Sequence, residues 1–323
     1  MSNDAYFADN RRNWDDRVPI HAASSLYNLD GYVNDPSLLS STVEFDVRYV
    51  GDVAGKTLLH PQCHIGTDTL SWARLGAAVT GIDFSGRAIA TATDLATRMG
   101  IDARFIESDI YAAPDVLDEQ FDVVYTGVGA ICWLPDIRRW AQTMATFTKP
   151  GGSFYMREGH PVMWSLDWER QGDELRIQLP YFERDTPETF EEAVTYAGEG
   201  TLASTTIHSW NHGIGQILTA LLDVGFRIDR FEEHRFLEWS ALPQMVERDG
   251  RWYLPDDERD LVPLMYSLLA TKAGPVPART HLGPESHSEN VLAAVSVRAG
   301  ARSHRTPGVV PRRSHDRSGP PSP

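Results

Sequence analysis

Short apolar runs alternate with amphipathic stretches through the first half of the chain, and no other feature limits the fold as strongly. Five apolar runs predict strands at residues 56–60, 78–83, 103–107, 121–126 and 153–157. Three stretches between them have the apolar spacing of helices: residues 67–75, 85–100 and 135–147. Strands that are separated by helices pair in parallel. The sequence therefore predicts a doubly wound α/β sheet with a ligand crevice at the carboxyl ends of its strands.

The second half of the chain interrupts this rhythm. Residues 160–205 are rich in charged and aromatic side chains but have no long period, and we interpret them as an insertion that forms a lid beside the crevice. A helix at 214–222 and strands at 226–234 and 261–270 then resume the pattern. The predicted parts are an N-terminal helical cap (1–50), an α/β core (51–159), the insertion or substrate lid (160–205), the C-terminal part of the core sheet (206–272) and a low-complexity tail (273–323).

The composition of the tail differs from that of the rest of the chain. Its 51 residues contain no Phe, Trp or Tyr, but eight prolines and five glycines. Such a segment cannot bury enough apolar surface to offset the entropy that it loses on ordering. We therefore expect a disordered tail. We interpret it as a solvated extension, although its basic end leaves open a tether to an anionic partner.

Charge and cysteine content disfavour several classes of protein. The formal net charge is −15, which argues against nucleic acid as a partner because a polyanion is repelled by such a surface. Two cysteines, Cys63 and Cys132, are too few for a disulfide scaffold or a four-thiolate zinc site, and they fit a reducing cytoplasm. No run of about 18 apolar residues and no leader-like start are visible, so we expect neither a membrane span nor a secretory signal.

The residues that follow the first three strands carry the clearest chemical signal. A tight turn at residues 61–66 brings backbone N–H groups and the start of a helix to the crevice. Asp83 ends the second strand, where a carboxylate can accept hydrogen bonds from both ribose hydroxyls of a nucleoside. Asp109 follows the third strand. Beside an adenine it would accept from the exocyclic amine, and the N–H of Ile110 would donate to a ring nitrogen.

Taken in order, several motifs resemble those of the class I S-adenosylmethionine-dependent methyltransferases, and the resemblance spans residues 10–272. The matching segments are 13–21, 62–70, 80–85, 132–136, 149–152 and 221–226. The first motif reads Gln-Cys-His-Ile-Gly (62–66). It is similar to a bacterial and fungal branch with Leu-Gln-Cys-His-Phe-Gly, whereas most relatives have Gly-x-Gly-x-Gly. The resemblance implies a mostly parallel seven-stranded sheet.

The resemblance also implies S-adenosylmethionine in the crevice and in-line transfer of its methyl group to a small-molecule acceptor. The residues that it implies for cofactor binding are Gln62, His64, Gly66, Asp83, Phe84, Asp109, Ile110 and Thr126. Because the methyl group is already activated, the protein mainly supplies alignment and exclusion of water. The chain departs from the family at His60, where most members have an acid, and at Pro61, which lacks a backbone N–H.

Further candidates lie where the acceptor would bind. Trp14, Trp133 and Glu158 are the predicted substrate-binding residues. His160 follows the fifth strand at its carboxyl end and is the first choice for a base or an orienting group. His208 is the second catalytic candidate, beside the alternatives of a helix cap or a solvated loop. A base is needed only if the acceptor must lose a proton.

Other functions fit the sequence less well. A dinucleotide dehydrogenase needs Gly-x-Gly-x-x-Gly at the first turn, which residues 60–66 lack. A zinc enzyme needs a His-x-x-x-His pair with a carboxylate on a helix, and since no such set is found we expect no metal. A nucleic-acid amino methylase would carry Asn/Asp-Pro-Pro-Tyr/Phe after the fourth strand, where this chain reads Thr-Gly-Val-Gly (126–129). A noncatalytic S-adenosylmethionine-binding regulatory protein remains the alternative function.

Overall fold

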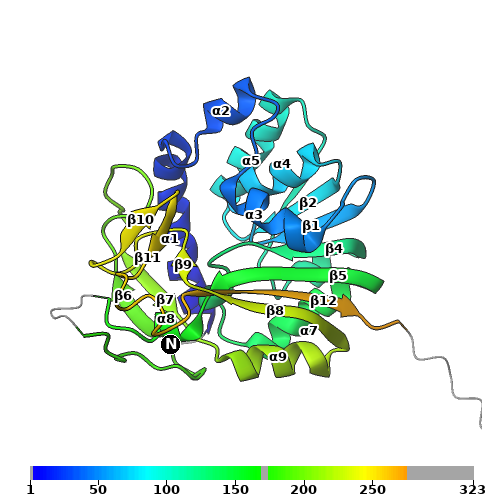
Figure 1. Ribbon diagram of the computed structural model, residues 1–323. Helices are drawn as coiled ribbons and strands as arrows, with labels where there is room; N and C mark the ends of the chain where they lie inside the picture. Colours follow the sequence, from blue (N-terminus) through cyan, green and yellow to red (C-terminus); the bar gives the residue numbers. More distant parts are fainter. Residues whose placement is uncertain (1–2, 169–173, 275–323) are drawn as a thin grey trace, which may run out of the picture. The chain divides into compact units, whose positions relative to one another are not determined.

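Seven strands form the central sheet of the computed structural model, which describes residues 3–168 and 174–274. The strands are β1 (Thr57–Pro61), β2 (Ala78–Asp83), β3 (Arg104–Glu107), β4 (Phe121–Thr126), β5 (Thr148–Gly159), β8 (Phe226–His234) and β12 (Met265–Lys272). Their order across the sheet is β3-β2-β1-β4-β5-β12-β8 (Figure 1). The first five of these pair in parallel, and β12 runs antiparallel to both of its neighbours. The predicted mostly parallel sheet is confirmed.

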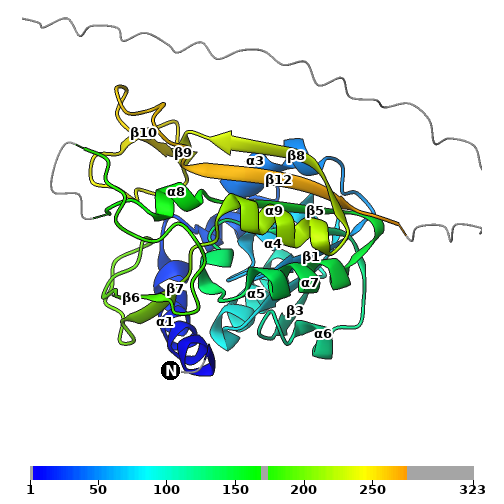
Figure 2. The ribbon, with the colours of Figure 1, turned by 90° about the horizontal axis from the view of Figure 1, so that it is seen from below.

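Helices cover both faces of this sheet (Figures 1 and 2). One face carries α3 (Ser41–Val50), α4 (Thr67–Arg74) and α5 (Gly86–Met99), and the other carries α7 (Ile137–Phe147) and α9 (Ile214–Asp223). The short helix α6 (Ala113–Val116) packs on the same side as α7. Successive side chains of β1 point to opposite faces. Leu58 therefore packs into the apolar cluster beside α3 and α4, while its neighbour Leu59 packs into the cluster beside α7 and α9.

The helices of the core begin and end at residues that the sequence marks. The hydroxyl of Ser85 accepts from the N–H of Ala88 and starts α5, and Gly100, with a φ of 66°, ends it. The carboxylate of Asp136 accepts from the N–H of Arg139 and starts α7. Ser and Asp satisfy the unpaired N–H groups of a first turn, and glycine adopts the left-handed conformation that closes a last turn. These signals explain why the predicted helix boundaries agree with the structure.

The N-terminal segment connects the core to the insertion. Its helices are α1 (Asn3–Ala23) and α2 (Leu29–Asn34), followed by α3. Helix α1 packs against α5 on one side and against β7 (Thr206–Ser209) on the other. Strand β7 pairs antiparallel with β6 (Glu188–Glu191) of the insertion. Figures 1 and 2 both place α1 beside this pair of strands.

Several regular elements were not predicted. The insertion contains the short helix α8 (Pro161–Trp164) in addition to β6. The segment of the chain that joins β8 to β12 forms another small sheet, of β9 (Phe236–Leu237), β10 (Val246–Arg248) and β11 (Arg251–Tyr253). Strands of two or three residues are too short for an alternation to be visible in the sequence. Strand β12 begins at Met265, four residues later than predicted.

The predicted tail and the predicted absence of a membrane span can be compared with the described residues only. The tail predicted at 273–323 lies outside the described residues from 275 onward. Within residues 3–168 and 174–274, none of the helices is both long enough and apolar enough to cross a membrane.

Candidate active site

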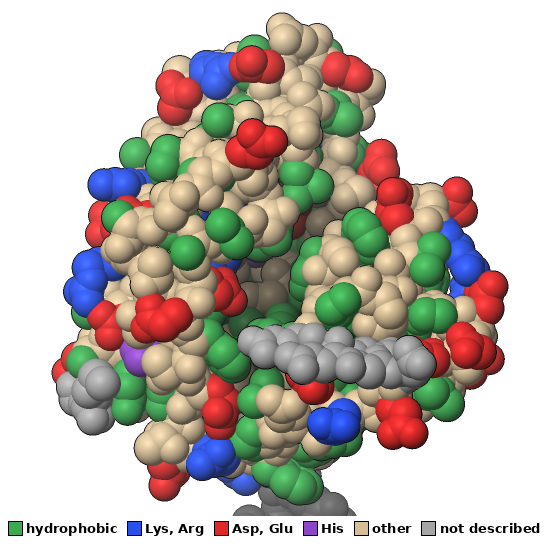
Figure 3. Space-filling view, turned by 90° about the vertical axis from the view of Figure 1, so that its left-hand side faces the viewer, with side chains coloured by type: hydrophobic (Ala, Val, Ile, Leu, Met, Phe, Trp, Pro, Cys, Tyr) green, Lys and Arg blue, Asp and Glu red, His purple; other side chains and the backbone are tan. Residues whose placement is uncertain are grey.

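The parallel strands end at the face that is shown in Figure 3, and this face is hollowed near its centre. The loop that joins β1 to α4 lies at these strand ends. Its backbone is left-handed at Gln62 (φ 57°), His64 (φ 49°) and Gly66 (φ 80°). A Cβ atom on Gly66 would lie 2.8 Å from the Cβ of Ala92, so this position requires glycine. The loop therefore turns tightly and leads directly into α4.

Asp83, the last residue of β2, lies against this loop. One carboxylate oxygen accepts from the backbone N–H of His64 at 2.8 Å, and the other accepts from the N–H of Ser85 at 2.9 Å. The side chain is largely buried, and burial raises the pKa of Asp83 to about 6. A carboxylate has about four acceptor sites, so two further hydroxyl donors can be accommodated. Phe84 follows Asp83 and is partly exposed.

Asp109 follows the neighbouring strand at the same edge of the sheet. Asp83 is paired with Glu107 across β2 and β3, and the N–H of Ser108 donates to the carbonyl of Asp83 at 2.9 Å. The carboxylate of Asp109 accepts from the N–H of Tyr111 at 2.8 Å. The structure thus brings the ends of the two strands together, as predicted, while the side chain of Ile110 is buried in the core.

Gln62 connects the first loop to the loop after β4. Its side-chain amide donates to the carbonyl of Ala130 at 2.8 Å. Its Oε1 atom is buried and has no hydrogen-bond partner among the described residues. Buried polar atoms are normally paired, so an unpaired one beside a crevice indicates that a ligand or water donates to it.

The side chain of Thr126 does not reach the crevice. It is fully buried, and its Oγ1 is 4.0 Å from the Sδ of Met144 on α7. Side chains alternate across a strand, and this one points into the core below the sheet. Only the backbone of Thr126 and the glycines after it are left at the strand end.

Glu158 holds the loop after β4. Its carboxylate accepts from the N–H groups of Gly129, Ala130 and Ile131 at 2.9, 2.8 and 3.1 Å. The side chain is fully buried, and burial raises the pKa of Glu158 to about 7. These contacts give Glu158 a structural role at the crevice and leave it no exposed oxygen with which to bind an acceptor.

Two tryptophans meet above the first loop. The ring of Trp14, on α1, lies 5.0 Å from the ring of His64 and 5.4 Å from the ring of Trp133, edge-on to both. The indole N–H of Trp133 donates to the carbonyl of Gly129 at 2.8 Å. The structure therefore brings together three of the predicted site residues from three distant segments of the chain.

The two histidines predicted to be catalytic are both engaged by other residues. His160 caps α8 by accepting from the N–H of Val162 at 3.1 Å, and its Nε2 lies 3.0 Å from a carboxylate oxygen of Glu233. Burial lowers the pKa of His160. His208, on β7, has its ring nitrogens 2.9 Å from Thr189 and 3.1 Å from Asp9. These contacts favour a role for His208 in docking α1 on the insertion.

His21 was not singled out from the sequence, yet it is bonded to the predicted site. Its Nδ1 lies 2.9 Å from Nε2 of His64, and its Nε2 lies 2.6 Å from the hydroxyl of Thr195. A signal was present in the sequence, because Trp14, Arg17 and His21 recur at helical spacing within one matching segment. They share one face of α1.

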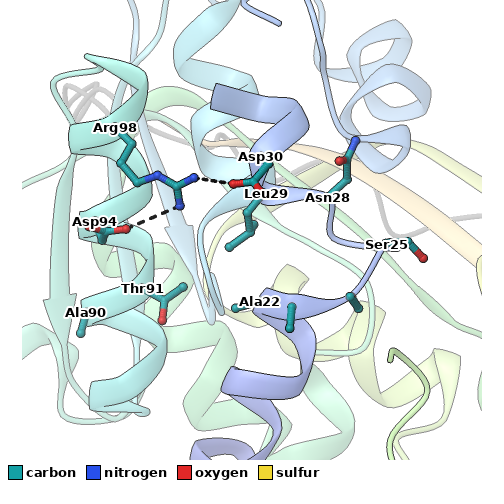
Figure 4. Close-up of a pocket in the computed structure, with 11 residues that line it drawn as sticks. Ala22, Ser25, Asn28, Leu29, Asp30, Ala90, Thr91, Asp94 and Arg98 are labelled. Carbon is teal, nitrogen blue, oxygen red and sulfur yellow. Dashed lines mark hydrogen bonds and ion pairs between the residues drawn. The ribbon is translucent and has the colours of Figure 1, made fainter. Parts of the chain in front are cut away.

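A separate cavity lies away from the strand ends. It has a volume of about 700 Å³ and is lined by the last residues of α1, by α2 and by the outer side of α5. Figure 4 shows Arg98 between Asp30 and Asp94 at its edge, at 2.6 and 3.8 Å. It is not part of the crevice. Asp83 lies just before the start of α5, whereas this cavity is lined by residues from the middle and the end of that helix.

Comparisons with known proteins agree with this geometry. Residues 59–152 match the model of a methyltransferase domain. The ubiquinone biosynthesis O-methyltransferase of Erwinia tasmaniensis is 27% identical over 134 residues, which are 41% of this chain and 55% of that protein. The enzyme of the same name from Shewanella pealeana is 32% identical over 102 residues, 32% of this chain and 43% of that protein. The chain thus spans only about half the length of these curated relatives.

A solved structure extends the likeness to most of the chain. A protein from Listeria monocytogenes, described as an S-adenosylmethionine-dependent methyltransferase, shares 20% sequence identity and a TM-score of 0.52. The match covers 72% of this chain and 97% of that protein. At this identity the likeness concerns the fold. The chain therefore has the class I methyltransferase fold, and the part that matches the methyltransferase domain runs from β1 to the start of β5.

Proposed function

We propose that the chain is an S-adenosylmethionine-dependent methyltransferase that moves a methyl group to a small-molecule acceptor. The observation that carries this proposal is the position of Asp83. It is a largely buried carboxylate at the end of β2, it is fixed by the N–H groups of His64 and Ser85, and it lies within the segment that matches a methyltransferase domain. An acid in this place accepts hydrogen bonds from the ribose of a bound nucleoside.

The residues present fit S-adenosylmethionine. Asp83 has lone pairs left for two ribose hydroxyls, and the buried Oε1 of Gln62 lacks a donor among the described residues. Asp109 and the N–H of Ile110 would hold the adenine, and the left-handed loop from Gln62 to Gly66 would hold the methionine part. The assignment to the branch with the Gln-Cys-His-x-Gly motif rests on that motif alone.

When bound, the cofactor would supply a methyl group on a cationic sulfonium; attack of the acceptor on the methyl carbon would break the sulfur–carbon bond and release S-adenosylhomocysteine. This chain supplies alignment and exclusion of water, which together contribute several kcal/mol. The rings of Trp14 and Trp133 meet at the first loop, and aromatic faces attract a cation. Glu158 keeps the loop after β4 in place through three N–H groups, so the acceptor side of the site is held rigid.

The small-molecule acceptor is supported by the charge of the chain and by the curated relatives. A net charge of −15 disfavours nucleic acid. The curated relatives are named for O-methylation in ubiquinone biosynthesis, and we propose a small acceptor for this chain without assigning the same compound. We also propose a cytoplasmic location, which fits the two unpaired, buried cysteines.

One observation favours the alternative of a noncatalytic S-adenosylmethionine-binding regulatory protein. Glu158 accepts from three backbone N–H groups, and His208 is bonded to Thr189 and Asp9. The Nδ1 of His160 accepts from the N–H of Val162, so in the neutral ring the Nε2 carries the proton, and none of the three groups is free to remove a proton from an acceptor. A methyltransferase with these residues would act on an acceptor that is already nucleophilic. Turnover therefore has to be measured separately from binding.

Two measurements test the proposal. Calorimetry should show binding of S-adenosylmethionine and S-adenosylhomocysteine, and Asp83→Asn should weaken it about ten- to a hundredfold because hydrogen bonds to a charged acceptor are lost. Asp122→Asn is the matched control, since Asp122 is bonded to Lys149 and Thr57 at the start of β4, the opposite end of that strand from the crevice. Transfer of labelled methyl to a small-molecule extract separates the enzyme from the binding protein. An unchanged affinity in Asp83→Asn would refute the site.

A further inference from the structure

Two histidine rings are hydrogen-bonded to each other beside the candidate cofactor site. His21 Nδ1, on α1, lies 2.9 Å from His64 Nε2, in the loop after β1. His21 is fully buried and His64 is partly buried. The two residues are 43 positions apart in sequence, so the bond holds α1 to the loop.

This bond is the middle of a longer chain of contacts. At one end the backbone N–H of His64 donates to Asp83 at 2.8 Å. At the other end His21 Nε2 lies 2.6 Å from the hydroxyl of Thr195, which belongs to the insertion. Four residues therefore connect the end of β2 to the insertion through hydrogen bonds alone.

Both rings are neutral near pH 7. Burial, and then the charge of Arg17, lowers the pKa of His21 to about 3. Burial also lowers the pKa of His64, with His21 and Arg17 adding to the effect. Between two neutral imidazoles one nitrogen donates and the other accepts, so the tautomer of one ring determines that of the other. The hydroxyl of Thr195 can donate or accept and is compatible with either arrangement.

Aromatic side chains hold both rings in place. Trp14 lies edge-on to His64 at 5.0 Å and to His21 at 6.1 Å, and Tyr27 stacks on His21 at 5.0 Å with 18° between the planes. The hydroxyl of Tyr27 is 2.6 Å from that of Tyr196, the neighbour of Thr195. The insertion thus contacts the histidine pair through two successive residues.

We propose that His21 is a positioning residue of the cofactor site, which couples docking of the insertion segment 192–196 to the placement of the His64 N–H that holds Asp83. The proposal rests on the proposed function. When Thr195 is docked, it fixes the ring of His21, which in turn fixes the ring of His64. The backbone N–H of His64 is then aimed at Asp83. Since coupling between two sites is reciprocal, a nucleoside on Asp83 stabilises the docked insertion by the same factor.

Thr195→Val tests the coupling, because it removes the hydroxyl and keeps the shape of the side chain. We expect it to weaken S-adenosylhomocysteine binding about three- to tenfold, the effect of one neutral hydrogen bond. Thr195→Ser keeps the hydroxyl and should bind as the natural chain does. Thr189→Val is the matched control, because it removes the same kind of contact, from a threonine hydroxyl to the ring of His208, at 2.9 Å and away from His64. It should change the affinity less than about twofold.

Two further readouts separate coupling from simple loss of structure. In the natural chain, S-adenosylhomocysteine should slow amide exchange of residues 192–196, and Thr195→Val should abolish this slowing at a temperature well below the unfolding midpoint of either protein. His21→Phe keeps a ring but no nitrogen, and combining it with Thr195→Val should weaken binding no further than His21→Phe alone.

The outcomes distinguish the two proposals. If the natural chain binds neither S-adenosylmethionine nor S-adenosylhomocysteine, the proposed function is wrong. If it binds them but Thr195→Val binds equally well, or Thr189→Val loses as much affinity, the coupling through His21 is wrong and the proposed function stands.

Discussion

The guanidinium of Arg157 lies 2.6 Å from Oδ1 of Asp46, and neither side chain is exposed to solvent. Arg157 belongs to β5 and Asp46 to α3, so the ion pair fastens this helix to the sheet. The hydroxyls of Tyr125 and Tyr155 donate to the same carboxylate at 2.8 and 2.7 Å. The charge of Asp46 is therefore compensated by three donors in an environment without water.

Removing Asp46 leaves the hydroxyls of Tyr125 and Tyr155 and the Nε of Arg157 buried without their acceptor, and Arg157 keeps only its ion pair with Glu238. We expect Asp46→Ala to lower the free energy of unfolding by about 3–5 kcal/mol, measured by urea denaturation. Glu119→Ala is the control, because Glu119 pairs with Arg104 at 2.6 Å where both side chains are half exposed. That pair should contribute less than about 1 kcal/mol. Equal losses in the two variants would contradict the role of the buried pair.

Glu158 should make stability depend on pH. Its pKa is raised from 4.5 to about 7 by burial. Because the folded state binds the proton more tightly than the unfolded state, this stabilisation is complete below pH 4.5 and is lost as the pH rises through 7. We expect the natural chain to lose about 2–3 kcal/mol between pH 5 and pH 8 relative to Glu158→Gln, which has no group to titrate there. Parallel pH profiles for the two proteins would exclude this effect.

His60 should make the protein less stable as the pH falls, the opposite of the effect of Glu158. It is buried, its Nδ1 lies 2.8 Å from the hydroxyl of Thr69, and burial lowers the pKa of His60 to about 3. The unfolded chain therefore takes up a proton first, and stability is lost as the pH falls from 6.5 toward 3, by about 1.4 kcal/mol for each pH unit. His60→Gln should lose less stability than the natural chain between pH 6.5 and pH 5. Chemical denaturation at the two pH values measures the difference, and identical losses would show that His60 does not titrate as proposed.

The sequence could predict the positions of those candidate residues that lie at the end of a strand. Asp83 and Asp109 could be placed at one edge of the sheet because the first ends an apolar strand and the second follows one, and parallel strands end at one edge. Thr126 ends β4 as predicted, but the sequence does not show that its side chain points to Met144 and into the core. From the sequence, Glu158 is predicted to bind the acceptor because its carboxylate follows the apolar part of a strand. Only the structure shows that this carboxylate accepts from N–H groups of the loop after β4 instead. The contacts of His21 could not be predicted because its partners are 43 and 174 positions away.

Gly66 tests whether the left-handed loop is needed for cofactor binding. An added methyl group would lie 2.8 Å from Ala92 and 3.0 Å from Phe105 at a φ of 80°. Gly66→Ala should therefore cost about 1–2 kcal/mol for the backbone conformation and a further ~1–3 kcal/mol for the overlap. Gly100→Ala is the control, since its φ is 66° and nothing lies within 4 Å of the added atom, so that only the first cost applies. We expect Gly66→Ala to abolish S-adenosylhomocysteine binding in calorimetry and Gly100→Ala to retain it, because only the first glycine shapes the loop that holds Asp83. Retained binding in a folded Gly66→Ala variant would show that the cofactor does not depend on this turn.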